Sequence, residues 1–266
     1  MHWRARLKRW RYGTWGRASA QFPYWGVPVH YPRGSLMFDL VCTQGIFEHG
    51  NLRVLSRLVR PETWVFDVGC NIGLMSVPLL REHASVRVAA FEPVPWVADC
   101  LERTAAHASL GGRLRVHRVA LSDTPGRAQF AMGAAGDDAY SGLRDTGRGW
   151  SAKRRIDVEV RTLDAVWREL GEPPVSVIKL DVEGADSLVL AGATECLARC
   201  RPAILLEWNE TNLRAYDIAP ESLLDRAARW GYVCYTAPAL VPVNSAAHLR
   251  ACLAHTESFV LLPIAT

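Results

Sequence analysis

Short apolar runs that end in an acid or a glycine alternate along this chain with segments whose apolar residues recur at helical spacing. The clearest case begins at Trp64, where β-forming residues lead up to Asp67 and a turn follows with glycine at 69 and 73. Beyond that turn, apolar residues from Leu74 to Leu80 recur on one face of a helix. The pattern predicts a buried strand, a tight turn and a helix N-terminus, which open a doubly wound α/β domain.

The same alternation continues to the C-terminus. Helices are predicted over 96–110 and 222–230, and a further helix is predicted to contain Leu188, Leu190 and Leu197. Two segments with alternating apolar residues, 128–132 and 156–160, also predict strands. We therefore expect an α/β, Rossmann-like, doubly wound and mostly parallel seven-stranded sheet whose last strand is antiparallel. Besides the strand at Trp64, its strands are predicted at 86–91, 114–121, 175–180, 202–206, 232–235 and 259–262.

Residues 1–44 precede this domain and differ from it in pattern. Tryptophans and cations alternate up to about Tyr24, and turn signals then separate two β-prone pieces, Val27–Tyr31 and Leu36–Phe38. We interpret 1–44 as a basic aromatic arm and a β-hairpin, and 45–266 as the main domain. The main domain starts with a helix whose apolar face includes Leu52 and Leu55 and which Pro61 closes.

One long segment lacks a periodic pattern. Residues 133–153 are rich in Gly, Ala, Asp and Ser between the strands predicted at 128–132 and 156–160. Long loops of this kind are often lids or substrate-binding elements, so we expect a mobile substrate loop, with an irrelevant insertion as the alternative. The residues in it that would meet a substrate are Tyr140, Ser141, Arg144 and Trp150.

Charge is concentrated at the N-terminus. The net charge is +4, yet no acid precedes Asp39, so the arm carries the positive charge and the remainder is slightly acidic. Basic residues interleaved with tryptophan suit an anionic membrane, which predicts peripheral contact through residues 1–17 at the inner membrane surface. A solvated helix that packs its tryptophans on the domain is the alternative. No recognition module accompanies the arm, so we expect no nucleic acid partner.

The cysteines and apolar runs bear on location. The 7 cysteines are scattered, with no C-x-x-C pair and no zinc spacing. Reduced, mostly buried thiols in a cytoplasmic protein are the interpretation. No run reaches transmembrane length, and the N-terminus lacks the apolar region of a signal peptide.

The turn at Gly69 limits the ligand. A dinucleotide fingerprint would need glycine at the positions of Asn71 and Leu74, so that pattern fails. The pattern D-x-G-x-x-x-G from Asp67 to Gly73 instead resembles the first motif of S-adenosylmethionine-dependent methyltransferases. In that case Asp67 would hydrogen-bond near the amino group of the cofactor. Glu92, which ends the next predicted strand, has the spacing of an acid that binds ribose hydroxyls.

A run of motifs from Gly45 to Pro202 resembles the FkbM-type methyltransferases. The matching stretches are 45–48, 66–73, 91–93, 120–123, 162–164 and 178–186, with Glu207 on the following strand. The resemblance implies S-adenosylmethionine as methyl donor and a hydroxyl of a sugar, glycan or polyketide-type small molecule as acceptor. Two positions depart from the family: Cys70, where alanine is usual, and Thr104, where asparagine is common. The implied cofactor-binding residues are Glu48, Asp67, Gly69, Cys70, Asn71, Gly73, Glu92, Pro93, Ala120, Leu121 and Asp181.

The acids at the ends of the later strands carry the candidate chemistry. Asp181, Glu183 and Glu207 are the candidate catalytic residues, because an alcohol needs a base to take its proton as the new bond forms. We expect Asp181 or Glu183 to be this base, with Glu207 and Glu48 shaping the pocket. A magnesium ion held by Asp181, Glu207 and Asn209 is a competing interpretation, which we do not favour. Helix capping would also explain acids at a helix N-terminus.

Two other classes of function stay open at this point. An NAD(P)-dependent oxidoreductase would use a similar fold, although the failed dinucleotide pattern disfavours it. A non-catalytic, membrane-docked scaffold would use the basic aromatic arm without any cofactor. The sequence also leaves open a homo-oligomer.

Overall fold

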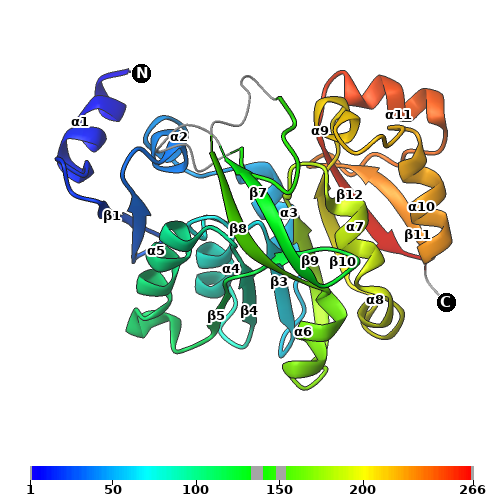
Figure 1. Cartoon of the computed structure of the whole chain (residues 1–266), viewed down its shortest axis with the longest axis horizontal. Coiled ribbons are helices and arrows are strands. Elements are labelled where there is room, and N and C mark those ends of the chain that lie inside the picture. The colour runs from blue at the N-terminus through cyan, green and yellow to red at the C-terminus, as the bar shows by residue number, and fades with distance from the viewer. Residues whose placement is uncertain (1, 133–139, 148–153, 265–266) are drawn as a thin grey trace.

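The seven strands predicted for the main sheet lie side by side in a computed structural model of the chain, which describes residues 2–132, 140–147 and 154–264. The strand order is β11-β12-β10-β9-β3-β4-β5 (Figure 1). β12 runs antiparallel to both of its neighbours, and the other pairings are parallel, which confirms the predicted arrangement. The strands are β3 (Trp64–Val68), β4 (Arg87–Phe91), β5 (Leu114–His117), β9 (Val175–Leu180), β10 (Ala203–Glu207), β11 (Tyr232–Thr236) and β12 (Ser258–Pro263).

Helices cover both faces of the sheet, which is why its central strands are mostly apolar. Every residue of β3 and of β9 is buried. Val65 and Val177 face one hydrophobic core, whereas Phe66 and Ile178 face the other. The first core contains residues of α3 (His49–Leu58), α4 (Ser76–Glu82) and α5 (Pro95–Ala105), and the second contains residues of α6 (Leu163–Glu169), α7 (Asp186–Ala191), α8 (Thr194–Cys200), α10 (Ser222–Trp230) and α11 (Ala246–Leu253). The remaining short helices are η1 (Ala108–Leu110) and α9 (Glu210–Arg214).

The strand predicted over 114–121 is divided between two sheets. Its first part is β5, and its last two residues form β6 (Ala120–Leu121). Between them Arg118 is exposed and forms ion pairs with Asp99 and Glu102 of α5 at 2.6 Å each. β6 joins β7 (Gly126–Met132) and β8 (Arg154–Arg161) in a three-stranded sheet of order β6-β8-β7, which crosses in front of the main sheet in Figure 1.

The predicted N-terminal hairpin exists, but its partners are different. β2 (Val27–Pro32) pairs with the preceding β1 (Ser19–Tyr24) and not with Leu36–Phe38. The two-residue turn at Trp25 and Gly26 has φ of 51° and 75°, the positive values of a tight hairpin turn. Leu36–Phe38 instead begins α2 (Leu36–Gln44), whose first turn Ser35 caps by accepting a hydrogen bond from the Phe38 N–H at 3.2 Å.

The N-terminal elements pack on the first face of the main domain. The His30 N–H of β2 donates to Thr104 Oγ1 of α5 at 2.9 Å. Phe22 and Phe38 belong to the same core cluster as Leu55 of α3. A division of the chain between residues 44 and 45 therefore stays a prediction.

Candidate active site

The turn after β3 is the first component of the site. Gly69, Asn71 and Gly73 all have positive φ, at 72°, 50° and 85°. The N–H groups of Gly69 and Cys70 donate to the Phe91 carbonyl at 3.1 and 3.2 Å. The turn is therefore held against the end of β4, with its backbone facing a cavity.

This cavity lies at the carboxyl ends of β3, β4 and β9 and holds about 870 Å³ of space, including its open mouth. Of the predicted site residues, Glu48, Asp67, Gly73, Glu207 and Asn209 are not part of its wall. The predicted residues that line it are Gly69, Cys70, Asn71, Glu92, Pro93, Ala120, Leu121, Asp181 and Glu183.

Glu92 is fixed at the end of β4, on the cavity wall. Its two carboxylate oxygens accept hydrogen bonds from the Asn71 N–H at 3.1 Å and the Val94 N–H at 2.8 Å. The side chain is almost completely buried. These two bonds fix the position of the carboxylate on the cavity wall.

Asp67 lies beneath the cavity. It is 1% exposed, and its Oδ2 accepts a hydrogen bond from Ser76 Oγ at 2.6 Å. Its Oδ1 lies 3.5 Å from Lys179 Nζ. Direct contact between Asp67 and a cofactor stays a prediction, and the contacts observed are with Ser76 of α4 and Lys179 of β9.

Lys179 links the turn to the acids and was not among the site residues predicted from the sequence. Its ammonium donates to the Gly69 carbonyl at 3.1 Å and to Asp181 Oδ2 at 3.3 Å. Burial by itself would lower the pKa of Lys179, but Asp181, Asp67 and Glu48 outweigh burial and raise it, so this lysine is charged. A lone cation in the apolar run of a central strand was the available signal, since a buried lysine needs an acidic partner.

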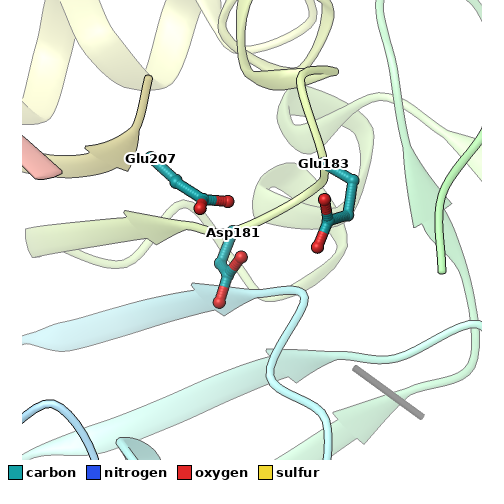
Figure 2. A group of neighbouring side chains, drawn as sticks. All are labelled: Asp181, Glu183 and Glu207. Carbon is teal, nitrogen blue, oxygen red and sulfur yellow. The ribbon is translucent and has the colours of Figure 1, made fainter. Parts of the chain in front are cut away.

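Three carboxylates meet beside the cavity. Asp181 follows β9, Glu183 lies in the next turn and Glu207 ends β10; Figure 2 shows the three side chains converging. One carboxylate oxygen of each residue lies within 4.8 Å of the corresponding oxygens of the other two. The side-chain amide of Asn212 on α9 donates to Glu183 Oε2 at 2.8 Å and to Glu207 Oε2 at 3.4 Å. Asn212 was missed because α9 is too short to give a periodic signal.

Glu48 lies close to this group at the start of α3. Its Oε2 accepts a hydrogen bond from the Asn51 amide at 3.0 Å, and Asn51 also donates to Ser258 Oγ of β12. Although the residue is exposed overall, partial desolvation of the carboxyl and then the nearby Asp181 raise the pKa of Glu48. The structure thus brings Glu48 near Asp181, and its role in shaping the pocket stays a prediction.

Asn209 takes a capping position. Its Oδ1 accepts a hydrogen bond from the Asn212 N–H at 2.9 Å and so caps α9. The third residue grouped with Asp181 and Glu207 is Glu183 and not Asn209. A metal ion held by Asp181, Glu207 and Asn209 stays untested.

Part of the predicted substrate loop contributes to the cavity wall. Residues 133–139 and 148–153, including Trp150, lie outside the described residues, but Ser141 and Leu143 line the cavity wall. Gly142 exchanges two backbone hydrogen bonds with Ala131 of β7, at 2.7 and 3.0 Å. Arg144 donates to the Ala215 carbonyl at 2.7 Å and lies 4.9 Å from the centre of the Tyr216 ring. These contacts fasten 141–144 to both sides of the site.

Asp186 should make stability depend on pH. It is completely buried at the start of α7, and neither carboxyl oxygen has a well-formed hydrogen bond within the described part of the chain. Burial raises its pKa from 3.8 to about 7. Between these values the unfolded chain releases a proton that the folded chain keeps, so stability falls as the pH rises. We expect the wild type to lose about 2 kcal/mol of unfolding free energy between pH 5 and pH 7 relative to Asp186→Asn, measured by urea unfolding. Parallel pH profiles of the two proteins would contradict this.

The comparison with protein families decides the class of the protein. The Methyltransferase FkbM domain matches residues 67–234. The chain belongs to the FkbM methyltransferase family. This membership confirms the resemblance found in the motifs, and it favours a methyltransferase over an NAD(P)-dependent oxidoreductase.

Relatives of this FkbM-family methyltransferase agree with the match. It is 29% identical over 192 residues to 2-O-methyltransferase NoeI of Sinorhizobium fredii, covering 65% of this chain and 74% of NoeI. It is 31% identical over 162 residues to 31-O-demethyl-FK506 methyltransferase FkbM of Streptomyces tacrolimicus, covering 52% of this chain and 62% of that protein. The crystal structure of methyltransferase FkbM from Methylobacillus flagellatus shares its fold, with a TM-score of 0.50 at 17% identity over 86% of this chain and 52% of that one.

Proposed function

We propose that this FkbM-family methyltransferase transfers a methyl group from S-adenosylmethionine to a hydroxyl oxygen of a sugar, glycan or polyketide-type small molecule. The names of two relatives specify O-methyl chemistry, at a 2-O and a 31-O position. The observation that carries the proposal is that one cavity has the motif turn on its wall together with Asp181 and Glu183. A donor site and a candidate base are therefore adjacent.

The residues of the cavity fit the cofactor that the family implies. When bound, S-adenosylmethionine supplies an electrophilic methyl group on a positively charged sulfonium. The turn at Gly69 would admit the ligand close to the backbone, and Glu92 would accept hydrogen bonds from its ribose. Asp67, Asp181, Glu183 and Glu92 outnumber Lys179, the one buried cation among the described residues, which favours a cationic ligand.

Glu183 is the base in this proposal. It lies on the cavity wall, is 5% exposed and is oriented by the neutral amide of Asn212. Asp181 instead contacts the Lys179 ammonium, so part of its charge is already compensated. Glu183 would take the proton of the acceptor hydroxyl, and Asp181 and Glu207 would orient the acceptor and Asn212. Ser141 and Leu143 on the cavity wall would exclude water from the reacting groups.

Calorimetry followed by a transfer assay tests the proposal. We expect the purified protein to bind S-adenosylhomocysteine and not NAD, because the turn lacks the dinucleotide fingerprint. Incubation with methyl-labelled donor and a panel of sugars, lipid-linked glycans and polyketides should then label one acceptor class at oxygen. Failure to bind S-adenosylhomocysteine would overturn the cofactor assignment, and label on carbon or nitrogen would overturn the O-methyl assignment.

Turnover is expected to survive exhaustive EDTA treatment. The carboxylates of Asp181, Glu183 and Glu207 could surround a cation, but N–H donors already face them: the Lys179 ammonium at Asp181 and the Asn212 amide at the other two. These donors occupy directions in which a hard cation would bind. The rate should change by less than about twofold, whereas a metal-generated nucleophile would be lost on chelation. Loss of activity that Mg²⁺ restores would contradict this.

A further inference from the structure

The N-terminal helix α1 (His2–Tyr12) exposes its apolar ridge to solvent. Trp3, Leu7 and Trp10 are spaced so that they share one face of a helix, and they are 64%, 52% and 65% exposed. Trp15, just after the helix, is 69% exposed. Figure 1 shows α1 at the outer edge of the molecule, at the end opposite α10 and α11. A surface helix ordinarily turns its apolar stripe toward the core, so this orientation is reversed.

The opposite side of α1 is attached to the protein. Ala5 is 4% exposed. Arg9 Nε pairs with Asp39 Oδ1 of α2 at 2.5 Å, and the Tyr31 hydroxyl of β2 donates to the Tyr12 carbonyl. This anchoring leaves Trp3 and Trp10 on the outward side, while Leu7 lies where that side meets a hollow lined by Tyr24 and Phe38.

Cations flank the ridge on both sides. At helical spacing, Arg4 and Arg11 fall on one flank and Arg6 on the other, and all three are exposed. No acid precedes Asp39, so nothing in the arm opposes their charge. Tryptophans at the centre of a face with arginines along its borders are typical of helices that lie in the interface of an anionic bilayer, where the rings enter the headgroup layer and the arginines reach the phosphates.

We propose that α1 docks this protein on an anionic membrane surface, with Trp3, Leu7 and Trp10 in the headgroup layer. Within the described residues no helix is long and apolar enough to span a bilayer, and α1 would lie along the surface. α2 connects this surface to the active site, because Asp39 holds α1 while Met37 lines the cavity. Docking would thus hold the cavity close to the bilayer and to acceptors carried in it.

Vesicle co-sedimentation of the full chain, without cofactor, tests the proposal independently of methyl transfer. We expect binding to phosphatidylcholine vesicles that contain about one third phosphatidylglycerol, and at least tenfold weaker binding to pure phosphatidylcholine. Raising the salt to about 1 M should release most of the protein, because the Debye length falls to about 3 Å. Tryptophan emission should shift to shorter wavelength on binding.

Two double variants and a matched control separate the contribution of the tryptophans to vesicle binding from that of the arginines. Trp3→Ala with Trp10→Ala keeps helix propensity and removes no buried contact, so it should fold normally by circular dichroism yet bind at least tenfold more weakly. Arg4→Glu with Arg11→Glu should lose binding to a similar degree. The control, Arg53→Glu with Arg57→Glu, makes the same charge change at exposed positions of α3 and should retain binding.

Three results would overturn the proposal. The first is no binding of the intact chain to the anionic vesicles, and the second is equal binding by Trp3→Ala with Trp10→Ala. The third is absence of vesicle binding together with one of two other associations. In one, the intact chain self-associates in light scattering while Trp3→Ala with Trp10→Ala stays monomeric, and in the other, the intact chain binds a single-stranded polynucleotide. The ridge would then be an interface between copies or a nucleic acid surface.

Discussion

Replacing Gly69 by alanine is expected to abolish cofactor binding. Gly69 has φ of 72°, and a Cβ there would lie 1.9 Å from the carbonyl oxygen of Asp181. That carbonyl cannot retreat easily, because the Asp181 N–H donates to Val68 on the same strand pair at 3.1 Å. The turn would have to move into the cavity. We expect at least a hundredfold loss of affinity for S-adenosylhomocysteine and about 3 kcal/mol of lost stability, since a left-handed side chain and a backbone clash combine.

Calorimetry and urea unfolding would measure both effects. Gly171→Ala is the matched control, because Gly171 has φ of 86° and open space where the new Cβ would lie. It bears the conformational cost without the clash, so it should lose about 1 kcal/mol and keep full affinity. Equal losses of stability in the two variants, or full affinity in Gly69→Ala, would show that the approach of Asp181 to the turn is unimportant.

Glu183→Gln is expected to lower kcat by about 10² to 10⁴, the usual contribution of a general base. The amide keeps the shape of the side chain and a hydrogen-bonding oxygen, but it cannot accept the proton of the acceptor hydroxyl. Affinity for S-adenosylhomocysteine should stay within about twofold, because the effect is confined to the proton-transfer step. Single-turnover rates with labelled donor, together with calorimetry, would measure this.

Comparison of three amide variants locates the base. Asp181→Asn should weaken cofactor binding as well as turnover, because it removes the partner of Lys179 beside the turn. Glu159→Gln, at an exposed position on β8, should leave both unchanged. If Asp181→Asn and Glu183→Gln both turned over at the wild-type rate with cofactor affinity intact, a carboxylate base at this position would be wrong.

Local patterns predicted the main sheet well because its central strands are buried on both faces. Such strands are mostly apolar runs, and β3, β4 and β9 are each followed directly by a residue that lines the cavity, namely Gly69, Glu92 and Asp181. The predictions failed where pairing had to be chosen between equivalent segments. Val27–Pro32 could pair forward or backward, and the positive φ values at Trp25 and Gly26 together with the Ser35 cap decided it.

The candidate site shows the same division. Motif spacing brought Gly69, Glu92 and Asp181 to one cavity, since the ends of parallel strands meet at one edge of the sheet. It did not reveal that Lys179 bridges Gly69 and Asp181, or that Asn212 holds Glu183. These contacts join residues far apart in the chain, and no local pattern records them.

By itself, the sequence determined the strands of the main sheet, the motif turn and the acids at strand ends, because these depend on hydrophobic periodicity and backbone preferences within a few residues. Only the tertiary structure decided which acids face the cavity, which cation compensates them and which way α1 turns its tryptophans. Those outcomes depend on distances between separate elements, where burial and charge pairing select one arrangement from several that the local pattern allows.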